Sequence, residues 1–131
     1  MPRKMCKTLV VEEHAGFRES LVGLLGGCFS TMIIEKAASG EEALIKSNRF
    51  SPNLIFLDIH LPGLNGLQLS KTLRSRDKNA VIVILTNHDG QEYRQAAYQC
   101  GANFFISKGE SAVDEILGVA ETVVIGTHTP H

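Results

Sequence analysis

Five short apolar runs, each followed by a segment of helical character, restrict the possible folds of this chain more than any other feature. The runs are residues 9–11, 32–34, 54–57, 81–85 and 104–106. They are continuous rather than alternating in polarity, which is expected for strands that are covered on both faces. Strands that alternate with helices through short connections are predicted to form a parallel sheet with right-handed crossovers.

The segments between the runs carry apolar residues at helical spacing, which indicates helices that pack on a core. These stripes comprise Phe17, Leu21, Leu24 and Leu25, then Tyr93, Ala96, Ala97 and Cys100, and finally Val113, Ile116, Leu117, Ala120 and Val124. A second helix is predicted to begin near Ser39, a third to follow Gly66, and the fourth to end at Gly101. We expect one α/β domain over residues 1–126, a doubly wound five-stranded parallel sheet in the order 2-1-3-4-5, and a frayed tail over residues 127–131.

The overall composition is that of an ordinary globular domain and excludes several classes of function. Of the 131 residues, 44% are hydrophobic and 21% are charged, and the net charge is −1. This balance offers no electrostatic basis for binding nucleic acid or a membrane surface. The three cysteines lack metal-ligand spacing, and no apolar segment is long enough for a membrane span or a signal peptide. We therefore expect a cytoplasmic domain with reduced thiols.

Polar side chains interrupt the apolar pattern at the carboxyl ends of four predicted strands. Glu12 and Glu13 follow the first strand, Asp58 follows the third, Thr86 follows the fourth and Lys108 closes the fifth. The order 2-1-3-4-5 would gather them into the crevice where open parallel sheets bind ligands. Neighbouring carboxylates repel one another unless a cation joins them, and such oxygen ligands suit Mg²⁺. A carboxylate nucleophile, a divalent metal, a lysine and a hydroxyl together form a set for accepting a phosphoryl group.

With these residues in place, the sequence resembles a two-component response-regulator receiver domain over essentially its whole length. The matching segments are residues 10–14, 57–66, 84–87 and 101–108. The resemblance implies the flavodoxin-like receiver fold and a role in signal transduction through a phosphorelay. It also implies that Asp58 takes a phosphoryl group from a sensor histidine kinase, so that the domain promotes its own phosphorylation without being a conventional enzyme.

The same resemblance assigns roles to the residues around the acceptor. Glu12, Glu13 and Asp58, with the main-chain carbonyl of His60, would hold Mg²⁺. Lys108 would pair with the phosphoryl oxygens. These assignments rest on the family pattern and not on the spacing of the residues.

Phosphorylation in this family shifts the population between an inactive and an active form. Thr86 would move inward to hydrogen-bond to the phosphoryl group, and Phe105 occupies the position of an aromatic ring that changes rotamer. A plain core ring is an equally good interpretation of Phe105. The face formed by the fourth helix, fifth strand and fifth helix would rearrange, with homodimerisation as the expected output and Tyr93 and Tyr98 as candidate contacts.

The acidic pair departs from the family pattern. The family usually has at least one aspartate at these two positions, whereas Glu12 and Glu13 are both glutamates. Because each side chain is one methylene longer, we expect the metal site to shift or to bind through water. Weaker or altered Mg²⁺ dependence follows as a hypothesis.

Three further departures flank the predicted site. Asn87 stands where a smaller residue is common and is expected to narrow access to the phosphoryl group. His60 and His88 occupy positions that influence, in the family, how quickly water removes the phosphoryl group. Exposed loop histidines are the simpler interpretation, and binding of Zn²⁺ together with His14 is a less favoured alternative.

The end of the chain resembles the NarL/FixJ type of receiver. Gly109 stands where many receivers have a proline, and residues 112–117 continue the likeness. Such receivers usually precede a helix-turn-helix domain, which implies regulation of transcription. No output domain is recognised in this chain, so DNA would be bound only through a domain outside it.

Three other interpretations were weighed against the phosphoryl-accepting receiver. A pseudo-receiver would use the same fold as a phosphorylation-independent interaction or dimerisation module, and the paired glutamates favour it. A flavodoxin-type flavin binder needs a phosphate-binding loop after the first strand, where this chain has two acids. An aspartyl-phosphate hydrolase would carry its nucleophile after the first strand, where no aspartate occurs. The receiver is the leading interpretation and the pseudo-receiver the alternative.

Overall fold

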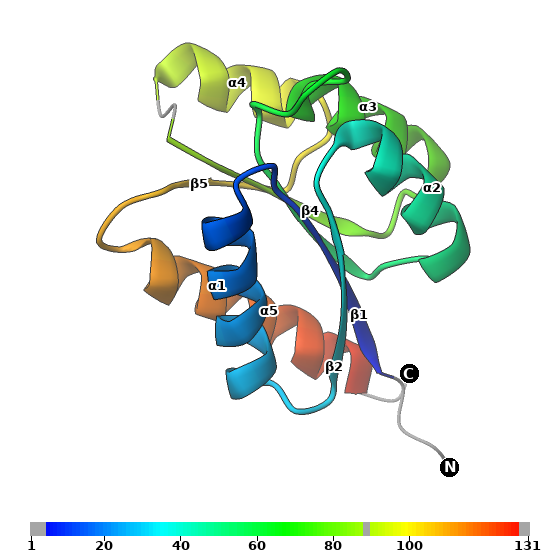
Figure 1. Cartoon of the computed structure of the whole chain (residues 1–131), viewed down its shortest axis with the longest axis vertical. Coiled ribbons are helices and arrows are strands. Elements are labelled where there is room, and N and C mark those ends of the chain that lie inside the picture. Colours follow the sequence, from blue (N-terminus) through cyan, green and yellow to red (C-terminus); the bar gives the residue numbers. More distant parts are fainter. Residues whose placement is uncertain (1–4, 88–89, 129–131) are drawn as a thin grey trace.

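A five-stranded parallel sheet forms the centre of the computed structural model, which describes residues 5–87 and 90–128 (Figure 1). Its strands lie in the order β2-β1-β3-β4-β5, and every neighbouring pair is parallel. They are β1 (Cys6–Val11), β2 (Met32–Ala37), β3 (Leu54–Leu57), β4 (Val81–Thr86) and β5 (Phe104–Ser107). The predicted doubly wound sheet and its order 2-1-3-4-5 are confirmed.

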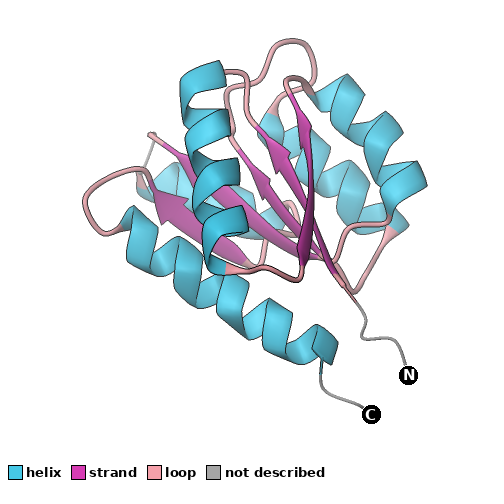
Figure 2. Cartoon of the chain, turned by 60° about the horizontal axis from the view of Figure 1, so that its bottom comes forward, coloured by secondary structure: helices cyan, strands magenta, loops and turns pink. Residues whose placement is uncertain are grey.

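Helices cover both faces of this sheet (Figures 1 and 2). They are α1 (Ala15–Cys28), α2 (Gly40–Phe50), α3 (Gly66–Arg76), α4 (Gln91–Gln99) and α5 (Ala112–His128). Helices α1 and α5 pack on one face, and α2, α3 and α4 pack on the other. The central strand β3 serves both layers, since Ile55 and Leu57 point to the second group of helices and Leu54 and Phe56 to the first. All four of these side chains are buried, as the uninterrupted apolar run predicted.

Local sequence signals set the helix boundaries. The Ser39 side chain caps α2 by accepting from the Glu42 N–H at 3.2 Å. Asn65 and Gln68 form a reciprocal capping box at the start of α3. Gly101 follows α4 with a φ of 91°, a conformation that favours glycine. The predicted starts of α2 and α3 and the end of α4 therefore agree with the structure.

The outer parts of the fold are more exposed than their apolar sequences predict. Ile33 in β2 is 40% exposed and Phe104 in β5 is 42% exposed, because these strands form the two edges of the sheet. Val113 is 48% exposed although it was assigned to the core stripe of α5. Ala112 and Ile116 are the buried residues of that turn, and a neighbouring position is rotated by about 100° around a helix. The prediction of full coverage is wrong at these three positions.

The last helix also extends further than predicted. Helix α5 continues through Gly126 to His128, two residues into the segment expected to be a frayed tail. The Thr127 hydroxyl donates to the Val124 carbonyl at 2.9 Å, which satisfies part of the final turn. The remaining tail residues, 129–131, lie outside the described part of the chain. Within residues 5–87 and 90–128, no helix has the length and apolar character needed to cross a membrane.

Candidate functional site

The sheet positions three predicted site residues at its carboxyl edge. The ladder continues one residue past each strand, because the Glu12 N–H donates to the Ala37 carbonyl at 2.9 Å and the Asp58 N–H to Val11 at 3.2 Å. The Lys108 N–H likewise donates to the Thr86 carbonyl at 2.9 Å. The backbone of each residue is therefore held by a neighbouring strand, which leaves only the side chains to be oriented.

Lys108 joins two of the predicted acids. Its Nζ lies 2.5 Å from Glu12 Oε1 and 2.7 Å from Asp58 Oδ2. The three side chains are nearly buried, with exposed fractions of 12% for Lys108, 7% for Glu12 and 10% for Asp58. Ion pairs shielded from water in this way are screened little by salt. The ammonium group therefore provides the cation that a cluster of acids requires.

The protonation states follow from this pairing. Burial raises the pKa of the Asp58 carboxyl, but hydrogen bonds from Lys108, the His60 N–H and the Thr86 hydroxyl, together with the lysine charge, bring that pKa below its usual value. Burial lowers the pKa of the Lys108 amine, but Asp58 and Glu12 outweigh it and raise that pKa above its usual value. Asp58 is thus a carboxylate and Lys108 an ammonium at neutral pH.

The β1–α1 loop is held by contacts that sequence reasoning missed. Glu12 Oε2 accepts from the His14 N–H at 3.1 Å, so both carboxylate oxygens of this residue have partners. Arg18 Nη1 donates to the main-chain carbonyls of Glu12 at 2.8 Å and Glu13 at 3.2 Å. His14 Nδ1 accepts from the Phe17 N–H at 3.1 Å and caps α1. Only the place of Arg18 in the first turn of α1, five residues after Glu13, could have suggested its role.

An open cavity of about 560 Å³ lies over this cluster. Its lining residues are Glu12, Glu13, His14, Phe17, Asp58, His60, Asn87 and Lys108. Glu13, His60 and Asn87 are exposed at its rim. The geometry therefore places a buried, ionised carboxylate and an ammonium at the floor of a solvent-accessible cavity that is large enough for a phosphoryl group.

Comparison with known proteins assigns this arrangement to a family. A family model described as the response regulator receiver domain matches residues 8–120. The chain belongs to the response regulator receiver domain family. Receiver domains of this family are parts of two-component response regulators, so the predicted identity is confirmed at that level.

Individual relatives of this receiver support the same assignment. A putative transcriptional regulator of Pseudomonas aeruginosa is 33% identical over 122 residues, which are 93% of this chain and 58% of that protein. The chain thus spans little more than half the length of that curated relative.

Two solved structures are similar to the receiver at 26% identity. The receiver domain of the putative response regulator NarL from Mycobacterium tuberculosis has a TM-score of 0.78, covering 92% of this chain and 98% of that one. Vibrio cholerae chemotaxis protein CheY4 has a TM-score of 0.82, covering 92% of this chain and 99% of that one. Because a NarL and a CheY protein match about equally well, the comparisons establish the receiver fold without selecting the NarL/FixJ type.

The two predicted switch residues of the receiver lie at the end of β4 and within β5. Thr86 is buried at the end of β4 and contributes to the hydrogen bonding of Asp58. Phe105 is 6% exposed, and the Arg94 guanidinium lies 4.8 Å from the centre of its ring. Tyr98 is 45% exposed on α4. Phe105 is therefore a core ring in this structure. The other flanking residue predicted from the sequence, His88, lies outside the described residues.

The donor atoms fit a hydrated hard cation better than a metal enclosed by side chains. Among the described residues, no three His, Cys, Asp or Glu side chains are grouped closely enough to hold an ion together. The Zn²⁺ alternative includes His88, which lies outside the described residues, so it stays a prediction. Glu13, Asp58 and His60 do border the same open cavity. Mg²⁺ keeps several water ligands and needs only one or two carboxylates, so this receiver site suits it.

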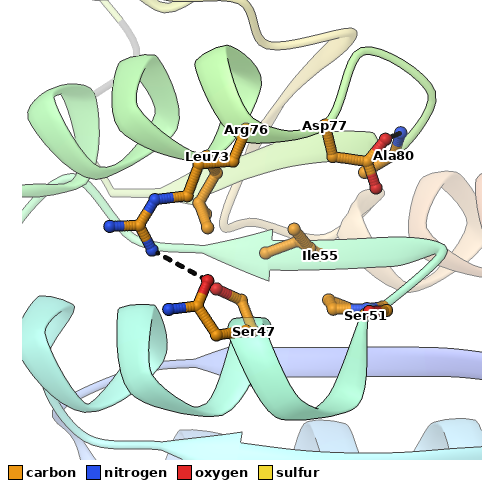
Figure 3. Close-up of a pocket in the computed structure, with 9 residues that line it drawn as sticks. Ser47, Ser51, Ile55, Leu73, Arg76, Asp77 and Ala80 are labelled. Atoms are coloured by element: carbon orange, nitrogen blue, oxygen red, sulfur yellow. Dashed lines mark hydrogen bonds between the residues drawn. The ribbon is translucent and has the colours of Figure 1, made fainter.

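A second cavity lies at the opposite end of the sheet (Figure 3). It has a volume of about 180 Å³ and lies between the ends of α2 and α3, where Arg76 Nη1 donates to Asn48 Oδ1 at 3.2 Å. Ser51 and Ala80, which precede β3 and β4, are among its lining residues. This cavity contains no buried charged cluster and is separated by the length of the strands from Asp58. The cluster at the carboxyl edge therefore stays the candidate functional site.

Proposed function

We propose that Asp58 accepts a phosphoryl group from a sensor histidine kinase and that this modification switches the receiver between two conformations. One observation carries the proposal. The Asp58 carboxylate is buried and ionised, yet it borders an open cavity and lies 2.7 Å from an ammonium group. A merely structural ion pair has no need of a cavity above the carboxylate.

The chemistry requires Asp58 to act as a nucleophile. A carboxylate oxygen attacks the phosphorus of a phosphohistidine, a new O–P bond forms, and the N–P bond breaks as the imidazole leaves. The charge on the transferred group lies mainly on its three equatorial oxygens. Lys108 already lies beside the nucleophile and would neutralise one of them, and the Thr86 hydroxyl would donate to another.

Mg²⁺ would be held by Glu13, Asp58 and the main-chain carbonyl of His60, with Glu12 contributing from the floor of the cavity. When bound, the metal supplies positive charge that neutralises the phosphoryl oxygens. Glu12 enters this set with both oxygens already hydrogen-bonded. The exposed Glu13 is therefore the acid of the pair that can reorient most readily toward a cation.

The proposed output is a change in the α4–β5–α5 face. A groove of about 570 Å³ lies on this face, and its lining includes Tyr98 and Phe104, which are 45% and 42% exposed. New bonds from Thr86 and Lys108 to a phosphoryl group would favour one arrangement of this face over another. Homodimerisation is the proposed contact. Regulation of transcription through an attached output domain is the proposed consequence, since the Pseudomonas aeruginosa relative is described as a putative transcriptional regulator.

Intact-mass spectrometry after treatment with acetyl phosphate and Mg²⁺ tests the proposal. Wild-type protein is expected to gain the mass of one phosphoryl group, and Asp58→Asn is expected to gain none. Asp114→Asn, on the exposed side of α5, is the matched control and should react like wild type. Wild-type protein without added mass would contradict the proposal and favour the phosphorylation-independent pseudo-receiver. Sedimentation of the treated protein then tests dimerisation.

A further inference from the structure

We propose that Phe17 is a positioning residue for Lys108, and that its ring holds the ammonium group at Asp58 through a cation–π contact. The catalytic part of this inference rests on the proposed function, because it is Asp58 that would receive the phosphoryl group. The contact itself is a property of the fold, and it can be tested separately.

The geometry around the ammonium group carries the inference. Lys108 Nζ lies 4.1 Å from the centre of the Phe17 ring, well within the range of cation–π attraction. On its other sides the same atom meets the carboxylates of Glu12 and Asp58. An ammonium has three N–H donors, and the ring covers a side that the two carboxylates leave open. Lys108 is therefore restrained from three directions although its side chain is long and flexible.

The ring is held in place by the start of α1. The Phe17 N–H donates to His14 Nδ1 at 3.1 Å, in the cap of the helix. Arg18, the next residue, donates to the carbonyls of Glu12 and Glu13 and ties the same turn to the β1–α1 loop. The attachment point of the ring is thus fixed relative to the acids that Lys108 contacts.

This arrangement matters when the charge on Asp58 changes. A phosphoryl group on Asp58 consumes the carboxylate that now binds Lys108 at 2.7 Å. The ring does not change its charge, so it continues to hold the ammonium near the position that the phosphoryl oxygens will occupy. Without the ring, Glu12 alone would hold the flexible Lys108 side chain. Fewer molecules would then have Nζ beside the phosphoryl group.

Packing is the competing explanation, because Phe17 also contacts the apolar cluster beneath α1. Three substitutions separate the two roles. Phe17→Leu keeps an apolar side chain and removes the aromatic face, whereas Phe17→Tyr keeps the face. Phe29→Leu, at the other end of α1, removes a partly buried aromatic ring that packs on the same cluster but lies outside the site.

The measurements are the affinity for beryllofluoride in Mg²⁺ and the rate of phosphorylation by acetyl phosphate. We expect Phe17→Leu to weaken beryllofluoride binding about tenfold, the effect of a cation–π contact of intermediate burial. Phe17→Tyr and Phe29→Leu should stay within about twofold of wild type. Equal losses in the leucine and tyrosine variants would show a packing role and overturn the inference, as would no loss in either.

A double-mutant cycle tests the contact even if Asp58 proves unreactive. Wild type, Phe17→Leu, Lys108→Met and the double variant are unfolded in urea, and the coupling between the two changes is calculated. We expect a coupling of about tenfold in the unfolding equilibrium constant. Coupling without any phosphorylation of wild type would refute the proposed function and leave the positioning contact intact. Absence of coupling would refute the positioning role, whatever the reactivity of Asp58.

Discussion

Replacing Gly66 by alanine should disturb the acceptor loop more than any other single methyl addition at the described glycines. Gly66 is buried at the start of α3, and its N–H donates to the Ile59 carbonyl at 2.8 Å. A Cβ at this position would lie 2.0 Å from the carbonyl oxygen of Asp58 and 2.7 Å from its carbonyl carbon. It would also lie 2.7 Å from Ile59 Cα. All three atoms belong to the main chain, so no side chain can rotate away.

The size of the effect follows from how far the loop must move. Ordinary contacts of a Cβ begin at 3.4 Å, so the Asp58 carbonyl or the start of α3 has to shift by more than an ångström. Overpacking of this kind costs about 1 to 3 kcal/mol, occasionally more. Alanine also lowers the conformational entropy of the unfolded chain, which offsets about 0.5 to 1 kcal/mol of this cost. Since the clash is with backbone, the upper end of this cost applies, and after the offset we expect the free energy of unfolding to fall by about 2 to 2.5 kcal/mol.

Gly118→Ala is the matched control for this substitution. Gly118 is a helical glycine in α5 with no atom within 4 Å of an added Cβ, so alanine should raise the free energy of unfolding by about 0.5 to 1 kcal/mol. Urea unfolding followed by circular dichroism measures both variants. The same Gly66 variant should also accept a phosphoryl group more slowly, because Asp58 moves with its carbonyl. A Gly66→Ala protein as stable as Gly118→Ala would refute the argument from close backbone approach.

Two further predictions concern stability away from the acceptor. Arg74 donates four hydrogen bonds of 2.7 to 3.1 Å to the loops before β4 and β5, so Arg74→Ala should lower the free energy of unfolding in urea by about 2 to 3 kcal/mol. Arg76→Ala is the control, because it loses one exposed hydrogen bond and should lower the same quantity by under about 0.5 kcal/mol. The hydrogen bond that Glu42 accepts from the Ala38 N–H, opposed by burial and aided by Lys46, lowers the pKa of Glu42 below its ordinary value of 4.5. Its stabilising effect is therefore present above that value and is lost as the pH falls through the lower folded pKa. Wild type should be more stable than Glu42→Gln at neutral pH and equal to it in strong acid; a constant difference across this range would contradict the assignment.

The strands and the ends of the helices could be predicted because they depend on features that are local in sequence, whereas the order 2-1-3-4-5 came with the doubly wound fold class. Continuous apolar runs such as residues 54–57 identify central strands, and turn residues such as Gly101 mark where helices end. Exposure at the edges could not be read from the same pattern. Ile33 and Phe104 are as apolar as buried strand residues, and only the position of β2 and β5 in the assembled sheet leaves them partly uncovered.

The members of the polar cluster at the carboxyl edge could be predicted from the sequence, but their pairing could not. Asp58, Thr86 and Lys108 each follow a strand, so topology alone brings them to one edge. Lys108 and Glu12 are 96 positions apart in sequence, so their contact depends on how the side chains are arranged in the folded protein. The roles of Arg18 and Arg74 were missed for a related reason. Most of their partners are main-chain carbonyls. Every residue has one, so the amino-acid sequence does not indicate which carbonyls are contacted.

The structure gives the two glutamates of the acidic pair different roles. The extra methylene lets Glu12 reach Lys108 with one oxygen while the other accepts from the His14 N–H, and its side chain is almost fully buried. Glu13 is exposed at the rim of the cavity, and only its main-chain carbonyl has a described hydrogen-bond partner in Arg18. The longer side chain therefore has opposite consequences at the two positions. In Glu12 it secures the lysine, whereas in Glu13 it lengthens the reach to a cation and raises the number of rotamers that binding must restrict. Any weakening of Mg²⁺ binding in this receiver should accordingly arise from Glu13, and shortening Glu12 should instead loosen Lys108.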